Sequence, residues 1–249
     1  MKKFQAKILE INKKTADISE FILGISEKMD FKNGQFLTIG IPHKKILERN
    51  GEKIVKDVVL KRAYSIVEIQ DGKIKLWIKN VNGIGTKFLF SQKIGNELNI
   101  AGSFGNFFVK GDEENLIFMA TGIGVPPIIS HLKQVFEGEK KFFEGKKILF
   151  LYGVREKKDF FFEEILKKFS SENKNFSYKI FFSREEKNFS DEEKKFFEKG
   201  YFTKIFEDKN FPFQNSEFYF CGSVPLKDEI LGILKERGID EEKFVFEAY

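Results

Sequence analysis

The chain has 249 residues, of which 41% are apolar and 33% are charged, and its 43 basic and 38 acidic side chains leave a net charge of +5. This length suits two modest domains with packed cores. The basic excess is slight and spread along the chain, so it gives no footprint for nucleic acid. The single cysteine, Cys221, excludes an internal disulfide and a cysteine-ligated iron–sulfur cluster, and His43 and His131 lack metal-ligand spacing. No metal site is expected, so any redox chemistry requires an organic cofactor.

No stretch reaches the roughly 18 consecutive apolar residues of a membrane span. The segment Met1–Phe4 leads straight into a strand pattern and carries no signal-peptide core. We therefore expect a cytoplasmic protein that has no membrane among its partners.

Residues 1–110 show short apolar runs separated by turn signals such as Asn33-Gly34 and Asp71-Gly72. Several short strands at this spacing are typical of an antiparallel barrel or sandwich, and we favour a small β-barrel as a first domain over 1–110. A further turn signal, Asn50-Gly51, predicts an added hairpin to which the sequence assigns no role. The strand patterns in this half are Lys7–Ile11, Ile18–Leu23, Phe36–Ile39 and Lys73–Lys79.

The tetrad Arg62-Ala63-Tyr64-Ser65 follows an apolar run and is predicted to lie on a strand. On a strand, Arg62 and Tyr64 share one face while Ser65 points to the other. A guanidinium pairs bidentately with phosphate and a phenol lies against an aromatic plane, so the pair suits a ligand with a phosphate and a flat ring. The alternative is an edge strand with a solvated arginine and a half-buried tyrosine.

The segment Gly83–Leu89 carries two glycines that permit a close backbone approach, and Thr86 is expected to cap a short helix that runs through Phe90. Free N–H groups at a helix start attract anions. The alternative is a plain capped helix between strands. With Arg62 also present, we favour a pyrophosphate held between the two.

Strand and helix patterns alternate over residues 111–249, which predicts a second domain built on a doubly wound parallel sheet with ligands at the carboxyl ends of its strands. The predicted strands are Asn115–Ala120, Lys147–Tyr152, Phe176–Phe182, Glu217–Phe220 and Lys243–Phe246. The predicted helices are Ile128 to about Phe136, a segment capped by Asp159 that runs through Phe169, and Pro225–Arg237 with Gly238 as its stop signal.

The turn Thr121-Gly122-Ile123-Gly124 lies between a predicted strand and a predicted helix, the setting that a phosphate-binding glycine turn requires. The sixth position is Pro127 rather than glycine. The dinucleotide-binding fingerprint is therefore incomplete, and the packing of its helix on its strand must differ.

The order of these motifs resembles the ferredoxin–NADP reductase family of flavoproteins over nearly the whole chain. Members carry Arg-x-Tyr-Ser/Thr, Gly-x-x-Ser/Thr-x-x-Leu, a Thr-Gly-x-Gly turn, a Tyr-Gly-x-Arg strand end and Cys-Gly before the last helix. This chain matches them in the same order at Arg62–Ser65, Gly83–Leu89, Thr121–Gly124, Tyr152–Arg155 and Cys221–Gly222. The resemblance implies a β-barrel followed by a nicotinamide-binding α/β domain, with FAD as cofactor and NADP(H) as co-substrate.

The resemblance also implies where FAD binds, in the seam between the two domains. Arg62 and the turn at Thr86 would hold the pyrophosphate, and Tyr64 would cover one face of the flavin ring. Ser65 would hydrogen-bond near the flavin N5 atom. The implied FAD-binding residues are Arg62, Ala63, Tyr64, Ser65, Ile78, Lys79, Gly85, Thr86 and Tyr249.

The chain ends Phe246-Glu247-Ala248-Tyr249, and family members carry a terminal aromatic residue that stacks on the flavin. Tyr249 would occupy the other flavin face until nicotinamide displaces it. Cys221 and Glu247 resemble the pair that lies beside the nicotinamide, and with Ser65 and Tyr249 they are the expected catalytic residues. The alternatives are a frayed tail for Tyr249 and a buried strand-end thiol for Cys221.

Plant-type members of the family grip the 2′-phosphate of NADP at the position of Ser183-Arg184, with a second cation and an adenine-stacking tyrosine where Lys199 and Tyr201 fall. A phosphomonoester favours a guanidinium and a hydroxyl, whereas NAD favours a carboxylate. We favour NADP; the alternative is a solvated, charge-rich loop. The implied NADP-binding residues are Thr121, Gly122, Arg155, Ser183, Arg184, Lys199, Tyr201, Cys221 and Gly222.

The resemblance implies an FAD-dependent NADPH oxidoreductase that exchanges hydride with NADP(H) and single electrons with an external carrier such as ferredoxin or flavodoxin. The alternatives are a reductase component for an oxygenase, a reductase of free flavin, and a non-catalytic electron-transfer subunit of a larger complex. One departure is Ser103, in a predicted turn where many members have proline.

Overall fold

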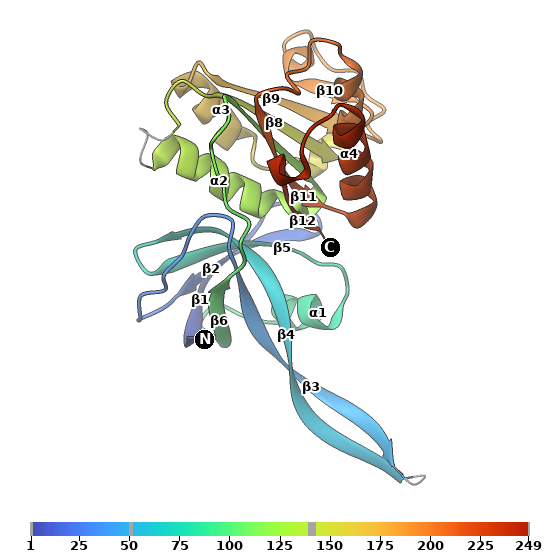
Figure 1. Cartoon of the computed structure of the whole chain (residues 1–249). Helices are drawn as coiled ribbons and strands as arrows, with labels where there is room; N and C mark the ends of the chain where they lie inside the picture. Colours follow the sequence, from blue (N-terminus) through green and yellow to red (C-terminus); the bar gives the residue numbers. More distant parts are fainter. Residues whose placement is uncertain (1, 50–51, 139–142, 249) are drawn as a thin grey trace. The chain divides into compact units, whose positions relative to one another are not determined.

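The computed structural model describes residues 2–49, 52–138 and 143–248, which fall into two compact units, 1–105 and 106–249 (Figure 1). The first unit is an antiparallel β-barrel, and the second is a parallel sheet covered by helices. The predicted two-part fold is therefore confirmed. Within the described residues, no helix combines the length and the apolar character needed to cross a membrane.

The barrel closes through six strands in the order β1-β2-β5-β4-β3-β6. In β1, buried Phe4, Ala6 and Ile8 alternate with exposed polar residues, so one face of the strand enters the core. The turn predicted at Asp71-Gly72 is present, with φ angles of 50° and 71°, the positive pair that a two-residue hairpin requires. The strands are β1 Lys3–Lys13, β2 Ile18–Gly24, β3 Phe36–Arg49, β4 Glu52–Gln70, β5 Lys73–Lys79 and β6 Glu97–Phe104.

Strands β3 and β4 extend beyond the barrel as a long two-stranded hairpin (Figure 1). Among the described residues, β3 pairs with β6 only over Phe36–Ile39, and β4 pairs with β5 only from Ile66 onward, yet β3 and β4 pair with each other out to Arg49 and Glu52. The predicted turn at Asn50-Gly51 lies outside the described residues. The strands on either side of it form the added hairpin that the sequence predicts.

Strand β6 corrects the prediction of a turn around Ser103. Ser103 lies in the last part of β6, and its hydroxyl donates a hydrogen bond to the Asp30 carbonyl at 2.6 Å. A proline at this position has no such donor. The serine therefore ties β6 to the segment before β3.

The second unit holds a six-stranded sheet in the order β10-β9-β8-β7-β11-β12, with every neighbouring pair parallel. The chain starts at β7, builds toward β10, and then returns to add β11 and β12 on the other side. The order therefore reverses between β7 and β11, where ligands of doubly wound sheets bind. The strands are β7 Asn115–Thr121, β8 Lys147–Val154, β9 Phe176–Phe182, β10 Phe197–Lys199, β11 Ser216–Gly222 and β12 Phe244–Ala248.

Helices cover both faces of this sheet. On one face, Ile230 and Leu234 of α4 (Val224–Glu236) and Phe202 of a 3₁₀ helix (Phe202–Glu207) pack on alternate strand residues. On the other face, α2 (Val125–Glu137) and α3 (Glu163–Glu172) meet through Phe136 and Phe169, whose ring centroids are 5.0 Å apart. Many of the 32 phenylalanines thus serve as ordinary core residues.

Two helix starts differ from the sequence prediction. α2 begins at Val125 rather than Ile128, because Pro126 and Pro127 suit a first turn, where their missing N–H groups have no acceptor in any case. α3 begins at Glu163 after Phe162, so Asp159 does not cap it. The cause is the burial of Phe160 and Phe162, which holds residues 160–162 out of the helix.

Candidate functional site

Arg62 and Tyr64 lie together against the start of α1 (Ile84–Phe90), as their shared strand face predicts. A Cβ atom on Gly85 would lie 2.8 Å from Cγ of Arg62 and 3.0 Å from the Tyr64 hydroxyl oxygen. Burial raises the pKa of Tyr64, and the neighbouring Arg62 opposes this shift. The Arg62 side chain is exposed, and its Nη1 donates to the Lys61 carbonyl at 3.0 Å. Only glycine at position 85 lets the three groups come this close.

The tetrad lies where the barrel strands β4 and β5 stop pairing. Their register ends at the pair Ile66–Leu76, so Arg62–Ser65 on β4 and residues 77–79 on β5 each have a strand partner on one side only among the described residues. Ile66 donates its N–H to the Gln35 carbonyl of the β3 side at 3.0 Å. Because main-chain groups alternate in direction, the N–H and C=O of Ala63 and Ser65 point to the open edge.

The start of α1 corrects one detail of the prediction. Gly83 is the N-cap residue, and Thr86 is the third residue of the helix rather than its cap. Its hydroxyl donates to the Gly83 carbonyl at 3.3 Å. No side chain of the described part of the chain caps this helix, so its first N–H groups, beside Arg62, keep their hydrogen-bonding capacity for an anion.

Ile78 and Lys79 lie on β5 at the same opening, but their side chains are engaged elsewhere. Ile78 is part of the barrel core, and Lys79 forms an ion pair with Asp17 at 3.1 Å. The expected contact with FAD therefore rests on their main-chain atoms. Tyr249, the other residue expected at the flavin, lies outside the described residues.

In the second unit, the predicted glycine turn meets the end of β11. A Cβ atom on Gly124 would lie 2.2 Å from the Cys221 carbonyl oxygen, and one on Gly222 would lie 2.4 Å from Oγ1 of Thr121. Gly122 has a φ of 50°, a conformation that glycine adopts without strain. The turn after β7 and the end of β11 thus pack closely against each other, which the missing side chains of Gly124 and Gly222 permit, at the point where the strand order reverses.

Cys221 and Glu247 are brought together by strand register. They lie directly opposite each other on the parallel strands β11 and β12. Burial raises the pKa of the Cys221 thiol, with the Glu247 charge adding to the shift, and burial raises the pKa of Glu247 to about 7. At neutral pH the thiol keeps its proton and the carboxyl is roughly half protonated. The thiol, and the carboxyl in its protonated form, then each have a proton to donate.

The carboxyl ends of β8, β9 and β10 bring the predicted phosphate-binding residues to one edge. Ser183 donates its N–H to the Val154 carbonyl at 3.0 Å, and Arg184 donates its N–H to the Arg155 carbonyl at 2.8 Å. The side chains of Arg155 and Arg184 are both exposed. Two cationic side chains therefore lie on adjacent strand ends.

Lys199 ends β10 opposite Phe182, next to Ser183, and its Nζ donates to the Glu186 carbonyl at 2.9 Å. Tyr201 follows two residues later with 66% of its surface exposed. These residues, which the resemblance assigns to one phosphate, thus lie at one sheet edge, and their roles toward NADP stay a prediction.

Comparison with known proteins identifies the second unit most directly. Residues 118–230 match a family model described as "Oxidoreductase NAD-binding domain". One subunit of the Na(+)-translocating NADH-quinone reductase of Idiomarina loihiensis is 26% identical over 266 residues, covering 93% of this chain and 64% of that subunit. The corresponding subunit from Serratia proteamaculans is 25% identical and covers 100% of this chain and 68% of its own length. The chain spans about two thirds of the length of these relatives.

Solved structures match both units. A ferredoxin NADP+ reductase from Neisseria gonorrhoeae with bound FAD and NADP gives a TM-score of 0.76 at 17% identity, covering 100% of this chain and 99% of that one. Amycolatopsis cytochrome P450 reductase GcoB gives 0.80 at 18% identity, covering 99% of this chain and 69% of that one. The second unit therefore matches the oxidoreductase NAD-binding family, and the whole chain has the two-part fold of the ferredoxin–NADP reductases.

The barrel of this reductase-like protein fits a flavin dinucleotide. Gly85 leaves the space in which Arg62 and the uncapped start of α1 converge, which suits a diphosphate. Beside it, the open edge of β4 offers the main-chain groups of Ala63 and Ser65 to the polar rim of a flat ring. Groups that suit a phosphate and groups that suit a flat ring therefore adjoin on one strand.

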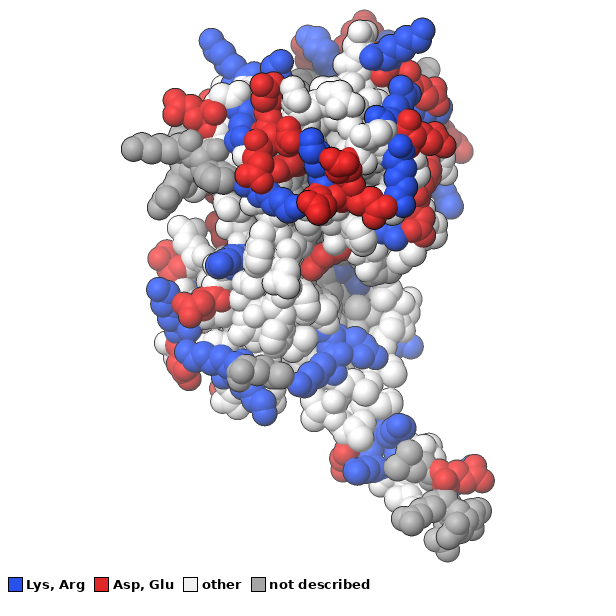
Figure 2. Space-filling model, in the orientation of Figure 1, with Lys and Arg blue, Asp and Glu red and all other residues white. Residues whose placement is uncertain are grey.

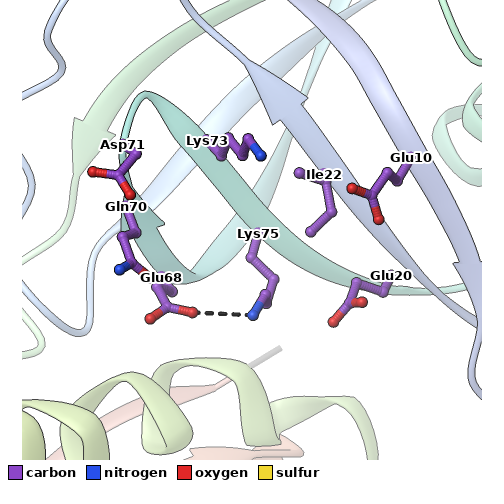
Figure 3. Close-up of a pocket in the computed structure, with 8 residues that line it drawn as sticks. All are labelled: Glu10, Glu20, Ile22, Glu68, Gln70, Asp71, Lys73 and Lys75. Atoms are coloured by element: carbon purple, nitrogen blue, oxygen red, sulfur yellow. Dashed lines mark hydrogen bonds and ion pairs between the residues drawn. The ribbon is translucent and has the colours of Figure 1, made fainter.

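A second feature of the reductase-like barrel is a hollow of about 360 Å³ on its outer face (Figure 3). Glu68 and Lys75 pair across it at 3.0 Å, and Glu20 accepts a hydrogen bond from Nε1 of Trp77 at 2.9 Å. Its acidic side chains outnumber its lysines, so it would repel a diphosphate, and it contains no predicted site residue. The lining residues are Glu10, Glu20, Ile22, Glu68, Gln70, Asp71, Lys73 and Lys75.

His131, to which the sequence assigns no role, is fully buried on α2. Its ring lies 4.9 Å from that of Phe107 and close to those of Phe118 and Tyr219. Among the described residues, neither ring nitrogen has a partner with hydrogen-bond geometry. Burial lowers the pKa of His131 to about 3, which the nearby Phe107 backbone opposes. The imidazole is therefore neutral in the folded protein.

This burial predicts a loss of stability in acid. The unfolded chain takes up a proton at His131 as pH falls below about 6.5, whereas the folded chain takes it up only near pH 3. The contribution of neutral His131 to the free energy of unfolding is thus fully present above pH 7, and the free energy of unfolding falls by about 2 kcal/mol by pH 5. We expect the unfolding free energies of wild type and His131→Leu, measured by urea titration from pH 7.5 to 5, to differ by a pH-dependent amount of this size. A constant difference would contradict the neutral, buried imidazole.

Proposed function

We propose that this protein is an FAD-dependent NADPH oxidoreductase that exchanges single electrons with an external carrier. The observation that carries the choice of NADPH is the grouping of Arg155, Arg184 and Lys199 at the carboxyl ends of three adjacent strands. Ser183 adds a hydroxyl at the same edge. A guanidinium and a hydroxyl suit the 2′-phosphate of NADP.

Glu185 supports this choice. A carboxylate at this place would favour the ribose hydroxyls of NAD. The Glu185 carboxylate instead accepts hydrogen bonds from the main-chain N–H groups of Lys157 at 3.0 Å and Lys187 at 3.1 Å, and these bonds lower its pKa. It acts as a loop-forming group, which would leave Arg184 to face the cofactor.

FAD would supply the redox chemistry, because a flavin takes two electrons from nicotinamide and passes them on singly. On the protein side, Arg62 and the start of α1 would hold its diphosphate. Tyr64 would lie against the ring, and Ser65 would hold a hydrogen bond near N5. Tyr249 is proposed for the opposite ring face.

Cys221 and Glu247 would orient the nicotinamide. Their register on β11 and β12 puts a neutral thiol and a half-protonated carboxyl side by side at the sheet edge where NAD(P) is expected. A protonated thiol and a carboxyl can each form a hydrogen bond with the carboxamide of the nicotinamide. Thr121, Gly122 and Gly222 would bring main-chain atoms close to the rest of the cofactor.

For the carrier we propose ferredoxin or flavodoxin, acidic proteins that suit the positive net charge of +5. Docking of this kind weakens as salt screens the charges. The rate of carrier reduction should therefore fall as ionic strength rises. A rate that salt leaves unchanged would count against this partner.

The choice of cofactor is tested by replacing Arg184 with alanine. We expect the KM for NADPH to rise about 10- to 100-fold while the KM for NADH changes little, because only NADPH carries the charge that Arg184 pairs with. Lys174→Ala is the control, since Lys174 is an exposed cation just before the amino end of the same strand, β9. Equal effects of Arg184→Ala on both cofactors would overturn the assignment.

A second candidate is an NADH-oxidising module of a larger reductase, favoured by the similarity to one subunit of two Na(+)-translocating NADH-quinone reductases. It predicts a preference for NADH in the wild-type protein and no preference change in Arg184→Ala. The same titrations therefore separate the two candidates.

A further inference from the structure

The outer half of the β3–β4 hairpin leaves apolar side chains in water. Ile46 is 65% exposed, Val55 59% and Val59 67%. Residues 40–49 of β3 and 52–61 of β4 pair only with each other within the described part of the chain. A two-stranded ribbon is marginally stable in water by itself. The hairpin would therefore be stabilised if another surface buried these apolar side chains.

Ile46, Val55 and Val59 share one face, because residues opposite each other on paired strands point to the same side. Along this face the cross-strand pairs are Pro42–Val59, Lys44–Asp57, Ile46–Val55 and Glu48–Lys53. We call these eight residues the hairpin face. Apolar pairs thus alternate with pairs of opposite charge, and the charges of the face sum to zero.

This pattern is self-complementary. Consider a two-fold axis that crosses the ribbon at the Ile46–Val55 pair and stacks two hairpins face to face. Each strand then meets its own copy running in the opposite direction, so Lys44 faces Glu48 of the second copy.

By the same symmetry, Asp57 faces Lys53 of the second copy, while Ile46 and Val55 meet themselves. All four charges lie within two residues of the axis, where the ribbon's twist displaces them least. We propose that the hairpin face is the contact surface of a symmetric dimer of this chain, in which the second copy covers Ile46 and Val55.

The charges favour a second copy over an acidic protein. The opposite face of the hairpin carries Lys45 directly across from Lys56, and it would attract an acidic partner more strongly. Both signs of charge are visible on the hairpin in Figure 2. The hairpin face has no net charge, so it does not attract an acidic partner in this way. It is complementary instead to a surface on which apolar and oppositely charged pairs alternate in the same order. The area of the hairpin face is small, so we expect a reversible dimer with a dissociation constant in the micromolar range.

Sedimentation velocity of the FAD-loaded full chain over a range of concentrations tests the proposal. Wild type should pass from monomer to dimer as concentration rises. Ile46→Glu should weaken the dimer about 100-fold or more, since each dimer loses two isoleucine contacts and gains two charges.

Ile54→Glu is the matched control, because Ile54 is 45% exposed on the opposite face of the same hairpin. It should leave the equilibrium unchanged. A wild type that stays monomeric at about 100 μM, or equal effects of the two substitutions, would overturn the proposal.

A mixing experiment tests the two-fold register itself. Lys44→Glu places two glutamates together in its own dimer, and Glu48→Lys places two lysines together, so each variant by itself should be monomeric. Mixed together, they restore both attractive pairs and should form a dimer of one copy of each. The neighbours of each substituted residue within its own chain are the same before and after mixing. Failure of the mixture to dimerise, where wild type does, would contradict the register.

Discussion

Replacing Arg62 with alanine is expected to weaken FAD binding about 100-fold, the largest effect of any single substitution in the barrel. Arg62 is the cation that lies with Tyr64 against Gly85 at the start of α1. Loss of a bidentate, charge-assisted contact to a diphosphate costs about 2–3 kcal/mol, which corresponds to this factor. Titration of the apoprotein with FAD, followed by flavin fluorescence, measures the change.

Lys61→Ala is the matched control for Arg62. Lys61 is an exposed cation on the same strand, and its side chain points to the other face. It should bind FAD as wild type does, since the main-chain carbonyl that accepts from Arg62 is kept. Full retention of FAD by Arg62→Ala would show that the tetrad is an ordinary edge strand with a solvated arginine.

Replacing Gly124 with alanine is expected to destabilise the second unit by about 3 kcal/mol or more. The new Cβ atom would lie 2.2 Å from the Cys221 carbonyl oxygen, and because the contact is with backbone, the ends of β7 and β11 must move apart. Nicotinamide binding should weaken as well, since Thr121, Gly122 and Gly222 lie at the same junction. Differential scanning calorimetry measures the stability.

Gly232→Ala provides the comparison for Gly124→Ala. Gly232 lies inside α4, and a Cβ atom there would meet nothing within 4 Å. Alanine is the better helix former, so this substitution should raise stability by about 0.5–1 kcal/mol. The expected result is that Gly124→Ala lowers the stability and Gly232→Ala raises it. A Gly124→Ala protein as stable as wild type would disprove the close contact of the two strand ends.

The sequence alone was sufficient to predict a strand or a turn wherever the residues of that element determine its conformation. Strand β9 covers Phe176–Phe182 as predicted, because apolar and polar residues alternate over its first five positions and this signal needs no distant information. The turn at Asp71-Gly72 follows from the two residue types that tolerate positive φ. The shared face of Arg62 and Tyr64 likewise follows from strand geometry alone.

Features that depend on tertiary packing could not be predicted from local sequence patterns. Asp159 carries a capping signal, yet the burial of Phe160 and Phe162 delays the helix to Glu163. The short strand β10 exists only because β9 lies beside it. The turn prediction around Ser103 was wrong because β6 continues past it to pair Phe104 with Phe36 of β3, with a shift of register at this point.

The candidate site shows the same division. Its motifs could be placed on strand ends from the sequence, but the pairing of Cys221 with Glu247 depends on the register of β11 and β12. The end of β4–β5 pairing at Ile66–Leu76, which leaves the tetrad edge open, depends on the register of these two strands. Neither property has a sequence signal by itself.

Anaerobic stopped-flow mixing of the FAD-loaded protein with NADPH and with NADH, followed at the flavin absorbance band, tests the proposed activity most directly. The flavin band should bleach with NADPH in a saturable phase, and NADH should require a higher concentration for the same rate. A protein that binds FAD yet bleaches with neither nucleotide would contradict the assignment.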